Sequence, residues 1–461
     1  MGKALLSVGL DVGTTSTQMI LSQLVIENRA SSFSVPEMEI AQRRILYKSP
    51  VHFTPLLSGD LVDGDGIRAL VKAEYETAGI RRESVDTGAV IITGETSRKE
   101  NARTVLDALA DFAGDFVVAT AGPDLESVLA AKGAGAVAYS EATGKTVLHM
   151  DIGGGTSNLA LIEDGRITAT GCLNVGGRLL KFDSLGAISY LSPVLVGLFD
   201  GKVGQIPTIN QLEALCDTLV SALEMAAGLR QLTPLLDKLW TKEADKPMSL
   251  RTSPQTGVAI PPTDQNPWEI APFVLSFSGG VADCIENVHP DLAFGDIGPM
   301  LGRAIRKSRL CAGEYRLGDE TIRATVIGAG CHSAQLSGST VFHQNMDFPM
   351  KNLPVVTHIS ALSQLDTPGV LALPGIPAAH YDEITQLSDE LVSQWPRQPM
   401  LIALEADMAK ALGHALALRL PKDAPILCID RVRLTEGSYL DVGTPIATAI
   451  PVVVKTLILS R

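Results

Sequence analysis

Two short stretches of the chain combine an aspartate, glycines and hydroxyl side chains in an order that suits phosphate binding. The first is DVGTTST at residues 11–17, and the second is DIGGGTSN at residues 151–158. Phosphates are held by backbone N–H groups that converge on one point, and glycine lets the backbone come close because it has no Cβ. Each stretch lies between two apolar, strand-like runs. The pattern therefore predicts two hairpins whose turns bind phosphate.

The amides and side chains of these turns define a predicted polyphosphate site. The groups expected to contact phosphate are Gly13, Thr14, Thr15 and Ser16 in the first turn and Gly153, Gly154, Gly155, Thr156 and Ser157 in the second. Asp11 and Asp151 end the preceding strands and are expected to hold Mg²⁺ through water, because this ion keeps several waters and binds few carboxylates directly. Two such hairpins facing one another would enclose a polyphosphate from both sides.

Either turn alone is more often a structural hairpin, and only the pair favours a binding site. Asp11 and Asp151 occupy equivalent strand–turn–strand settings in two successive parts of the chain. The long distance between them indicates two like domains rather than a solenoid, whose repeats are shorter. Neither turn is a Walker A loop, since no GxxxxGK(S/T) occurs, and no GxGxxG lies in a Rossmann context.

The elements that must position these turns indicate a mixed α/β protein. The first half is predicted to contain strands at 4–11, 16–26, 87–95 and 115–123 and helices at 65–79, 101–114 and 124–144. The same order restarts at residue 146 with three short strands. It continues with an amphipathic helix over 209–228 and a strand–glycine–helix segment around 273–287, and TIRATVIGAGCHSAQLSG (321–338) is predicted to be a strand, a glycine turn and a helix. Residues 241–272 are predicted to form a loop or insertion.

Composition excludes several classes of protein. The chain has 461 residues, enough for two or three domains, and 46% of them are hydrophobic. No apolar run reaches the roughly 18–20 residues needed to span a bilayer, and the N-terminus lacks the features of a secretory signal. Six cysteines without a CxxC pair indicate reduced thiols in a cytosolic protein. The net charge of −13 and the lack of a basic cluster make nucleic acid a poor partner.

Two further glycine segments connect the pattern to a known superfamily. SFSGGVAD (276–283) and VIGAGCHS (326–333), taken with the two turns, resemble the actin, hexokinase and heat-shock chaperone ATPase superfamily. The resemblance implies two ribonuclease-H-like (actin-like ATPase) domains flanking a nucleotide cleft, with ATP and Mg²⁺ as ligands, plus a C-terminal α/β extension. We expect the domains to span residues 1–140, 141–345 and 346–461. GAGAVAYS (133–140) and VIGAGCHS resemble the two connecting helices at the interdomain hinge.

The resemblance also implies roles for individual residues. Gly279, Gly280 and Val281 would contact the adenine and ribose, and Asp11 and Asp151 would serve the metal. Asp151 would also help to orient the attacking water. Glu95, in VIITGETSRKEN (90–101), ends a predicted strand where such ATPases can place a carboxylate near that water. A solvated charge at the start of a helix is an equally good interpretation of Glu95.

Over nearly its whole length the chain resembles the ethanolamine ammonia-lyase reactivase (EutA) family. The resemblance is carried by ITGETSRKENAR, DIGGGTSNLALIEDG, CLNVGGRLL, FGDIGPMLGRAI and DVGTPIATAIPVVVKTL, among other segments. It implies a chaperone-like ATPase that releases damaged cobalamin from adenosylcobalamin-dependent ethanolamine ammonia-lyase. The cobalamin would be bound by the lyase, since this chain has no DxHxxG motif. The cysteines indicate a cytoplasmic location, and the family resemblance implies association with a bacterial microcompartment there. A metabolite kinase and an actin-like assembly protein remain competing functions at this stage.

Overall fold

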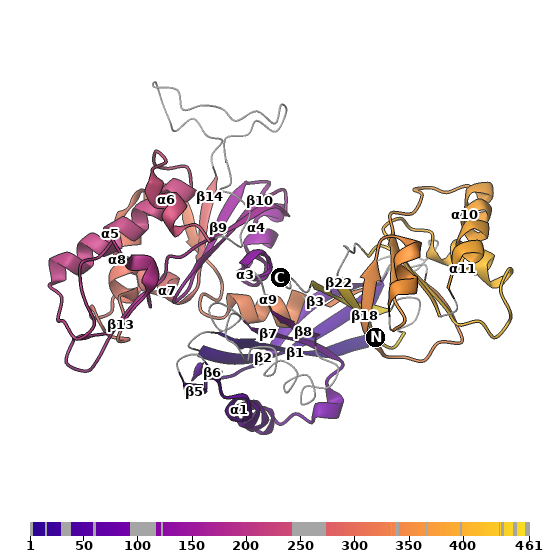
Figure 1. Ribbon diagram of the computed structural model, residues 1–461, viewed down its shortest axis with the longest axis horizontal. Coiled ribbons are helices and arrows are strands. Elements are labelled where there is room, and N and C mark those ends of the chain that lie inside the picture. Colours follow the sequence, from indigo (N-terminus) through magenta and orange to yellow (C-terminus); the bar gives the residue numbers. More distant parts are fainter. Residues whose placement is uncertain are drawn as a thin grey trace.

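The computed structural model describes most of the chain. The described residues are 3–13, 16–28, 38–58, 61–92, 117–120, 123–241, 273–332, 334–336, 341–365, 367–396, 399–432, 434, 438–445 and 450–456. They form a six-stranded sheet and a five-stranded sheet that share the same order over five strands, and a larger eight-stranded sheet at the C-terminal end (Figure 1). Among the described helices, none is long and apolar enough to cross a membrane.

The first sheet is built around the hairpin of β1 (Lys3–Val12) and β2 (Ser16–Asn28). Antiparallel β3 (Met38–Lys48) extends it on one side, while β7 (Thr87–Ile92) and β8 (Val117–Thr120) run parallel to β1 on the other. Because side chains alternate along a strand, Val8, Leu10 and Val12 share one face and pack against helix α1 (Gly64–Thr77). β3 lies between the strand predicted at 16–26 and the helix predicted at 65–79, where the sequence analysis predicted no strand.

The second sheet repeats this arrangement. β9 (Val147–Ile152), β10 (Ser157–Glu163) and β11 (Arg166–Leu173) are antiparallel neighbours, and β14 (Val274–Ser278) and β15 (Tyr315–Leu317) continue the sheet parallel to β9. Strand order and directions are thus the same in both sheets, as a duplicated, ribonuclease-H-like fold requires. β9 and β14 are buried along their whole length, which explains their continuous apolar character.

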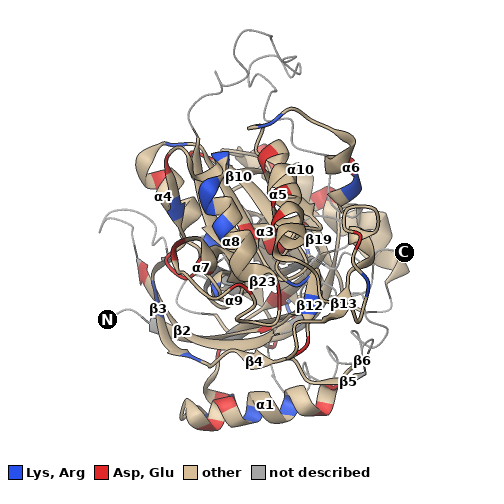
Figure 2. Cartoon of the chain, turned by 90° about the vertical axis from the view of Figure 1, so that its left-hand side faces the viewer, with Lys and Arg blue, Asp and Glu red and all other residues tan. Residues whose placement is uncertain are grey.

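Helices and a small hairpin complete the lobe around the second sheet. α5 (Ile209–Ala226) begins with a capping box formed by Thr208 and Gln211 and packs its apolar side into the core of this lobe. The other elements of the lobe are α6 (Pro234–Leu239), α7 (Gly280–Glu286), α8 (Gly298–Lys307), β12 (Leu180–Phe182) and β13 (Ile188–Leu191). Acidic and basic side chains both occur along α1 under the first sheet, as expected of a helix with one solvated face (Figure 2).

Two helices cross between the sheets and exchange lobes. α3 (Pro123–Gly133) follows the first sheet in sequence but packs on β9, β10 and β11, as does α4 (Ala136–Thr143), whereas α9 (Ala324–His332) packs back on β1, β2 and β7 (Figure 1). At the crossing, a Cβ on Gly133 would lie 1.8 Å from the carbonyl oxygen of Ala324. Residues 133–140, which resembled a connecting helix in sequence, contain the last residue of α3 and the first five residues of α4. The strand predicted at the start of 321–338 was wrong, because residues 324–332 are helical.

The C-terminal region is a separate α/β unit. Its eight-stranded sheet has the order β16-β23-β22-β18-β19-β20-β21-β17, with β18 to β21 parallel. The strands are β16 (Ala334–Leu336), β17 (Phe342–Gln344), β18 (Met350–Val356), β19 (Val370–Leu373), β20 (Met400–Leu404), β21 (Ile426–Ile429), β22 (Ser438–Val442) and β23 (Pro451–Thr456). α10 (Tyr381–Gln394) and α11 (Ala409–Ala417) cover one face. β16 and β23 contact β3 and β8, so this unit attaches to the first lobe.

Short elements fill the remaining connections. They are β4 (His52–Phe53), β5 (Leu56–Ser58), β6 (Leu61–Val62), and the 3₁₀ turns Arg82–Ser84, Pro193–Leu195, Arg309–Cys311 and Ile359–Gln364. β4 pairs with the start of β2 and thereby lies beside the first predicted phosphate turn.

Candidate nucleotide cleft

A cleft of about 470 Å³ lies between the two lobes where the β1–β2 and β9–β10 hairpins approach one another. Most of the residues predicted from the sequence line it. They are Asp11, Gly13, Ser16, Asp151, Gly153, Gly154, Gly155, Thr156, Gly279, Gly280 and Val281. The duplicated topology therefore brings segments far apart in the sequence to one cavity.

The remaining predicted residues are placed differently. Thr14, Thr15 and Glu95 lie outside the described residues. Ser157 is fully buried in β10, and its hydroxyl donates to the carbonyl oxygen of Val175 at 2.7 Å. It does not belong to the cleft lining, because residue 157 already lies in the strand, where its side chain points into the lobe. Ser157 thus stabilises the chain behind the second turn.

The two turns have the same internal hydrogen bond. Gly13 donates its N–H to the carbonyl of Ser16, and Gly153 donates to that of Thr156, each at 2.9 Å. The first turn is also fixed from outside, since the hydroxyl of Thr54 donates to the Gly13 carbonyl at 2.7 Å. The equivalence of the two turns in space matches their equivalence in sequence.

The second turn is supported by the segment that contains Gly176, Gly177 and Arg178. The N–H groups of Gly177 and Arg178 donate to the carbonyls of Gly153 and Gly154. A Cβ on Gly176 would lie 2.3 Å from the Gly154 oxygen, so only glycine allows this approach. Within the described residues, the carbonyls of Gly153, Gly154 and Thr156 accept hydrogen bonds from the chain itself. The N–H groups of Gly154 and Gly155 donate to no other described group and are available to an anion.

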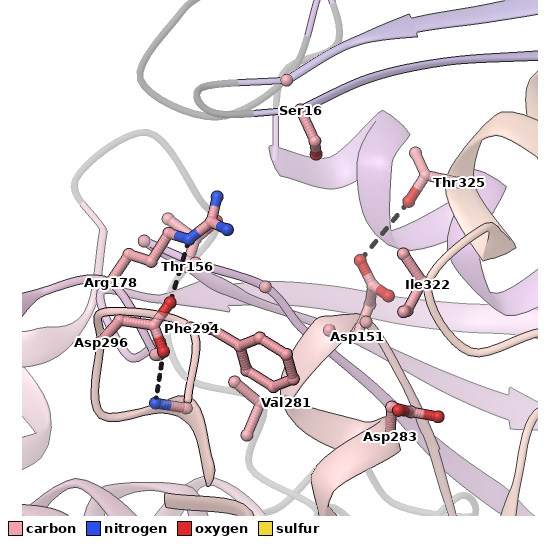
Figure 3. A pocket seen from close by; sticks show the side chains of 18 of the residues that line it. Ser16, Asp151, Thr156, Arg178, Val281, Asp283, Phe294, Asp296, Ile322 and Thr325 are labelled. Atoms are coloured by element: carbon pink, nitrogen blue, oxygen red, sulfur yellow. Dashed lines mark hydrogen bonds and ion pairs between the residues drawn. The ribbon is translucent and has the colours of Figure 1, made fainter. Parts of the chain in front are cut away.

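Asp151 is nearly buried at the end of β9. One carboxylate oxygen accepts a hydrogen bond from the hydroxyl of Ser278. The other accepts from the hydroxyl of Thr325 at 3.4 Å (Figure 3). Burial raises the pKa of the Asp151 carboxyl above its ordinary value, and these two hydrogen bonds oppose that rise. A cation in the cleft would stabilise the charged form further.

A buried histidine extends this network. His149 lies between Ser276 and Ser278, with its Nδ1 3.1 Å and its Nε2 3.0 Å from their hydroxyl oxygens. Burial lowers the pKa of His149 to about 3, so the ring is neutral at pH 7. Because Ser278 donates its proton to Asp151, it accepts from His149, which assigns the proton of the ring to Nε2. The chain of hydrogen bonds fixes the orientation of the Asp151 carboxylate.

Each aspartate has a carboxamide directly opposite it on the neighbouring strand. Gln18 pairs with Asp11 and Asn158 pairs with Asp151, and both carboxamides line the cleft. They are 4% and 3% exposed, yet the carbonyl oxygen of each has no hydrogen-bond partner among the described residues. A buried acceptor without a donor is costly and points to a missing ligand.

These oxygens fit a hydrated magnesium ion. Mg²⁺ prefers oxygen ligands and retains several waters, which can donate to carboxylates and to carboxamide oxygens alike. Asp11 and Asp151 supply the charge, and the carbonyl oxygens of Gln18 and Asn158 supply the acceptors. The described residues contain no group of three or more His, Cys, Asp or Glu side chains arranged to hold a metal directly. The donor set therefore suits a metal held largely through its water ligands.

A glutamate that sequence reasoning missed also faces this site. Glu126, on α3, is nearly buried and lines the cleft, and it accepts a 2.8 Å hydrogen bond from the side-chain amide of Asn158. Its helix begins in the first half of the chain but crosses to the second lobe. No local motif marks it. Gln18 follows Asp11 at the same distance in the sequence as Asn158 follows Asp151. This repeated Asp–carboxamide spacing could have been found from the sequence.

Another part of the cleft lining is formed by Gly279, Gly280 and Val281, which were predicted to contact the adenine and ribose. Gly279 has φ +91° and lies against the end of β9, where a Cβ would be 2.3 Å from the carbonyl oxygen of Ile152. Val281 and the half-exposed Phe294 provide apolar surface beside it (Figure 3). Apolar surface next to a turn with available N–H groups is the combination that a nucleoside phosphate requires.

Comparison with known proteins identifies the family of the chain. The family model described as "Ethanolamine utilisation protein EutA" matches residues 3–368 and 360–460. The chain belongs to the EutA family. It is 40% identical to ethanolamine ammonia-lyase reactivase EutA of Salmonella typhimurium and 39% identical to that of Escherichia coli, in each case over 99% of this chain and 98% of the relative.

A solved structure of another ethanolamine-utilisation protein also resembles the chain. It is EutJ from Carboxydothermus hydrogenoformans, with 17% identity, a TM-score of 0.34, and coverage of 71% of this chain and 89% of EutJ.

Proposed function

We propose that this EutA-family chain is an ATP-dependent reactivating factor for adenosylcobalamin-dependent ethanolamine ammonia-lyase. It would act as a chaperone that promotes the release of damaged cobalamin so that intact cofactor can replace it. The observation that carries the proposal is similarity to two reactivases over 99% of the chain, and the cleft with its two equivalent turns supports it. The relatives do not favour the metabolite kinase or the assembly protein. A location with the lyase, in the cytoplasm or a microcompartment, belongs to the same proposal.

In this proposal the two turns bind the phosphates of ATP and the aspartates hold its magnesium. The N–H groups of Gly154 and Gly155 would donate to phosphate oxygens, while Asp11 and Asp151 would hold the hydrated ion. Magnesium, when bound, neutralises negative charge on the phosphates. The described protein residues need mainly to position the reactants, because phosphoryl transfer depends on orientation and electrostatics.

Glu126 is the best-placed described residue to orient the attacking water. Its carboxylate lines the cleft and is held by Asn158, which itself lies opposite Asp151. A carboxylate in this position can accept the proton of the water as it attacks phosphorus. This assignment gives Glu126 the role that the sequence suggested for Glu95.

In this proposal, reactivation depends on a conformational equilibrium of this chain that is linked to ATP binding and to lyase binding. No chemical bond is formed in the lyase. The lobes meet at the α3–α9 crossing, so a difference between ATP-bound and ADP-bound states would be expressed as a change in the angle between them. ATP can shift the protein toward one state only by binding that state more tightly. The lyase would bind the favoured state, and cobalamin would remain a ligand of the lyase.

Recovery of inactivated lyase tests the proposal. Ethanolamine ammonia-lyase inactivated with cyanocobalamin is incubated with this protein, adenosylcobalamin and MgATP, and deamination is then measured. We expect recovery above a control without ATP, and the Asp151→Ala variant should abolish both ATP hydrolysis and recovery. Equal recovery without ATP would refute the assignment. Recovery with the Asp151 variant would show that the cleft is not needed for the function.

A further inference from the structure

Among the charged side chains in the described lining of the cleft, negative ones outnumber positive ones. The lining carboxylates are those of Asp11, Glu126, Asp151, Asp283 and Asp296. The only Lys or Arg side chains in the same lining are Lys181 and Arg178. A polyphosphate would add negative charge to a site that already has an excess of it, so these cations are the described groups able to offset that charge alongside a metal.

The stem of Arg178 lies directly on the second phosphate turn. A Cβ on Gly154 would be 3.2 Å from the Cδ of Arg178, and the Arg178 N–H donates to the Gly154 carbonyl at 2.6 Å. The side chain therefore runs over the tip of the turn whose amides are available to an anion. The turn that is proposed to hold phosphate thus positions the backbone and the aliphatic stem of Arg178.

Asp296 orients the guanidinium from the other side. Its Oδ2 accepts from the Nε of Arg178 at 3.1 Å, and its Oδ1 accepts from the N–H of Gly298 at 2.8 Å, at the start of α8 (Figure 3). Asp296 is 5% exposed, whereas the Arg178 side chain is 29% exposed and borders the cleft. The aspartate is thus part of the lobe, and the arginine is the member of the pair that a ligand can reach.

This ion pair uses only one of the N–H donors of Arg178. An arginine has five such donors in a rigid, planar fork. Within the part of the chain that the structure describes, the two terminal amino groups of Arg178 donate no hydrogen bond. A guanidinium whose Nε is anchored by a buried carboxylate and whose terminal groups border a cleft has the geometry for bidentate phosphate binding.

We propose that Arg178 binds the phosphates of the nucleotide through its terminal amino groups and that Asp296 is the residue that positions it. The inference rests on the proposed nucleotide function and deepens it, because it names a cationic phosphate ligand in the second lobe. The Arg178–Asp296 pair also connects two segments. The backbone of Arg178 is hydrogen-bonded to the second turn, and Asp296 is hydrogen-bonded to the start of α8.

Calorimetric titration of Arg178→Gln with MgATP, MgADP and adenosine tests the inference. We expect the affinity for MgATP and MgADP to fall by about ten- to a hundredfold, the range for losing charge-assisted hydrogen bonds. Adenosine carries no phosphate, so its affinity should change by less than about twofold. The salt dependence of MgATP binding should also become weaker, because one charge contact is lost.

Three further variants complete the experiment. Arg178→Lys keeps the charge but not the fork and should recover part of the MgATP affinity, and it remains informative if Arg178→Gln does not fold. Asp296→Asn should weaken phosphate binding without changing adenosine binding. Arg303→Gln is the matched control, because Arg303 pairs with Asp291 in the same lobe but outside the cleft lining. It should bind all three ligands as the wild type does.

Each possible result decides the question. Unchanged MgATP affinity in both Arg178 variants would overturn the inference, as would an equal loss for adenosine, which would show that Arg178 only shapes the lobe. If the wild-type protein bound neither MgATP nor adenosine, the proposed nucleotide function would itself be wrong, and this inference would fall with it. Thermal unfolding without ligand establishes that each variant is folded.

Discussion

Replacement of Gly133 by alanine should destabilise the joint between the lobes. A Cβ at this position would lie 1.8 Å from the carbonyl oxygen of Ala324, whereas real contacts of this kind are essentially never shorter than 3.0 Å. The two helices would have to separate by more than about 1 Å, because the obstacle is backbone and cannot rotate away. Overpacking costs about 1–3 kcal/mol where side chains can adjust, and the value here should lie at or above the top of that range.

Differential scanning calorimetry without nucleotide measures this effect. We expect the transition of Gly133→Ala to fall by at least about 5 °C, given a shift of about 2–4 °C per kcal/mol for lobes of this size. Gly313→Ala is the matched control, since a Cβ there meets no atom within 4 Å and its φ is not positive. If both variants melted within about 1 °C of the wild type, the helices would not cross as closely as described and the hinge would need another location.

Two further predictions concern side chains around Asp151. Glu126→Gln keeps a side chain of the same size but loses the basic oxygen, so steady-state ATP hydrolysis should slow by about 10²- to 10⁴-fold while MgATP affinity changes little; wild-type turnover would place the base elsewhere. His149 has a folded pKa of about 3 against an ordinary 6.5, so the unfolded chain binds the extra proton and the contribution of His149 to stability is lost as pH falls from about 6.5 toward 3. Urea denaturation at pH 7 and pH 5 should show a loss of about 2 kcal/mol from this residue, which His149→Gln should lack; equal losses in both proteins would contradict the assignment.

The local features of the fold could be predicted from the sequence. Both hairpins were predicted because apolar strands, a terminal aspartate and glycines are close together in the chain, and the helix over 209–228 was predicted from its amphipathic period. β3 was missed because it is an edge strand with several charged and exposed residues, which weakens its alternation. The strand predicted before VIGAGCHS was wrong, because a short apolar run fits a buried strand and a buried helix equally well.

The candidate site was only partly accessible to the same reasoning. Turn residues come from continuous segments, whereas Glu126 and Arg178 reach the cleft only through tertiary structure. Glu126 lies on a helix whose lobe cannot be deduced from its neighbours in the chain. Arg178 is determined by the docking of one loop on another, and its partner Asp296 is more than a hundred residues away in the sequence. Glu126 belongs to no repeat or motif that could have marked it. Arg178 lies in CLNVGGRLL, which carried the family resemblance but indicated no role for this arginine.

The crossing helices connect the hinge with the chemistry of the cleft. α3 belongs to the first half of the chain and brings Glu126 to Asn158 in the second lobe, while α9 packs on the first sheet and bonds Asp151 through Thr325. The carboxylate of Asp151 is therefore hydrogen-bonded to both lobes, since Ser278 belongs to the second sheet. A change in the angle between the lobes must alter the Thr325 bond while leaving the Ser278 bond intact. The orientation and charge of the aspartate proposed to hold the metal would thus depend on the angle at the same hinge that would transmit work to a partner. In the proposed function, occupancy of the cleft and movement of the lobes would be linked through this one side chain.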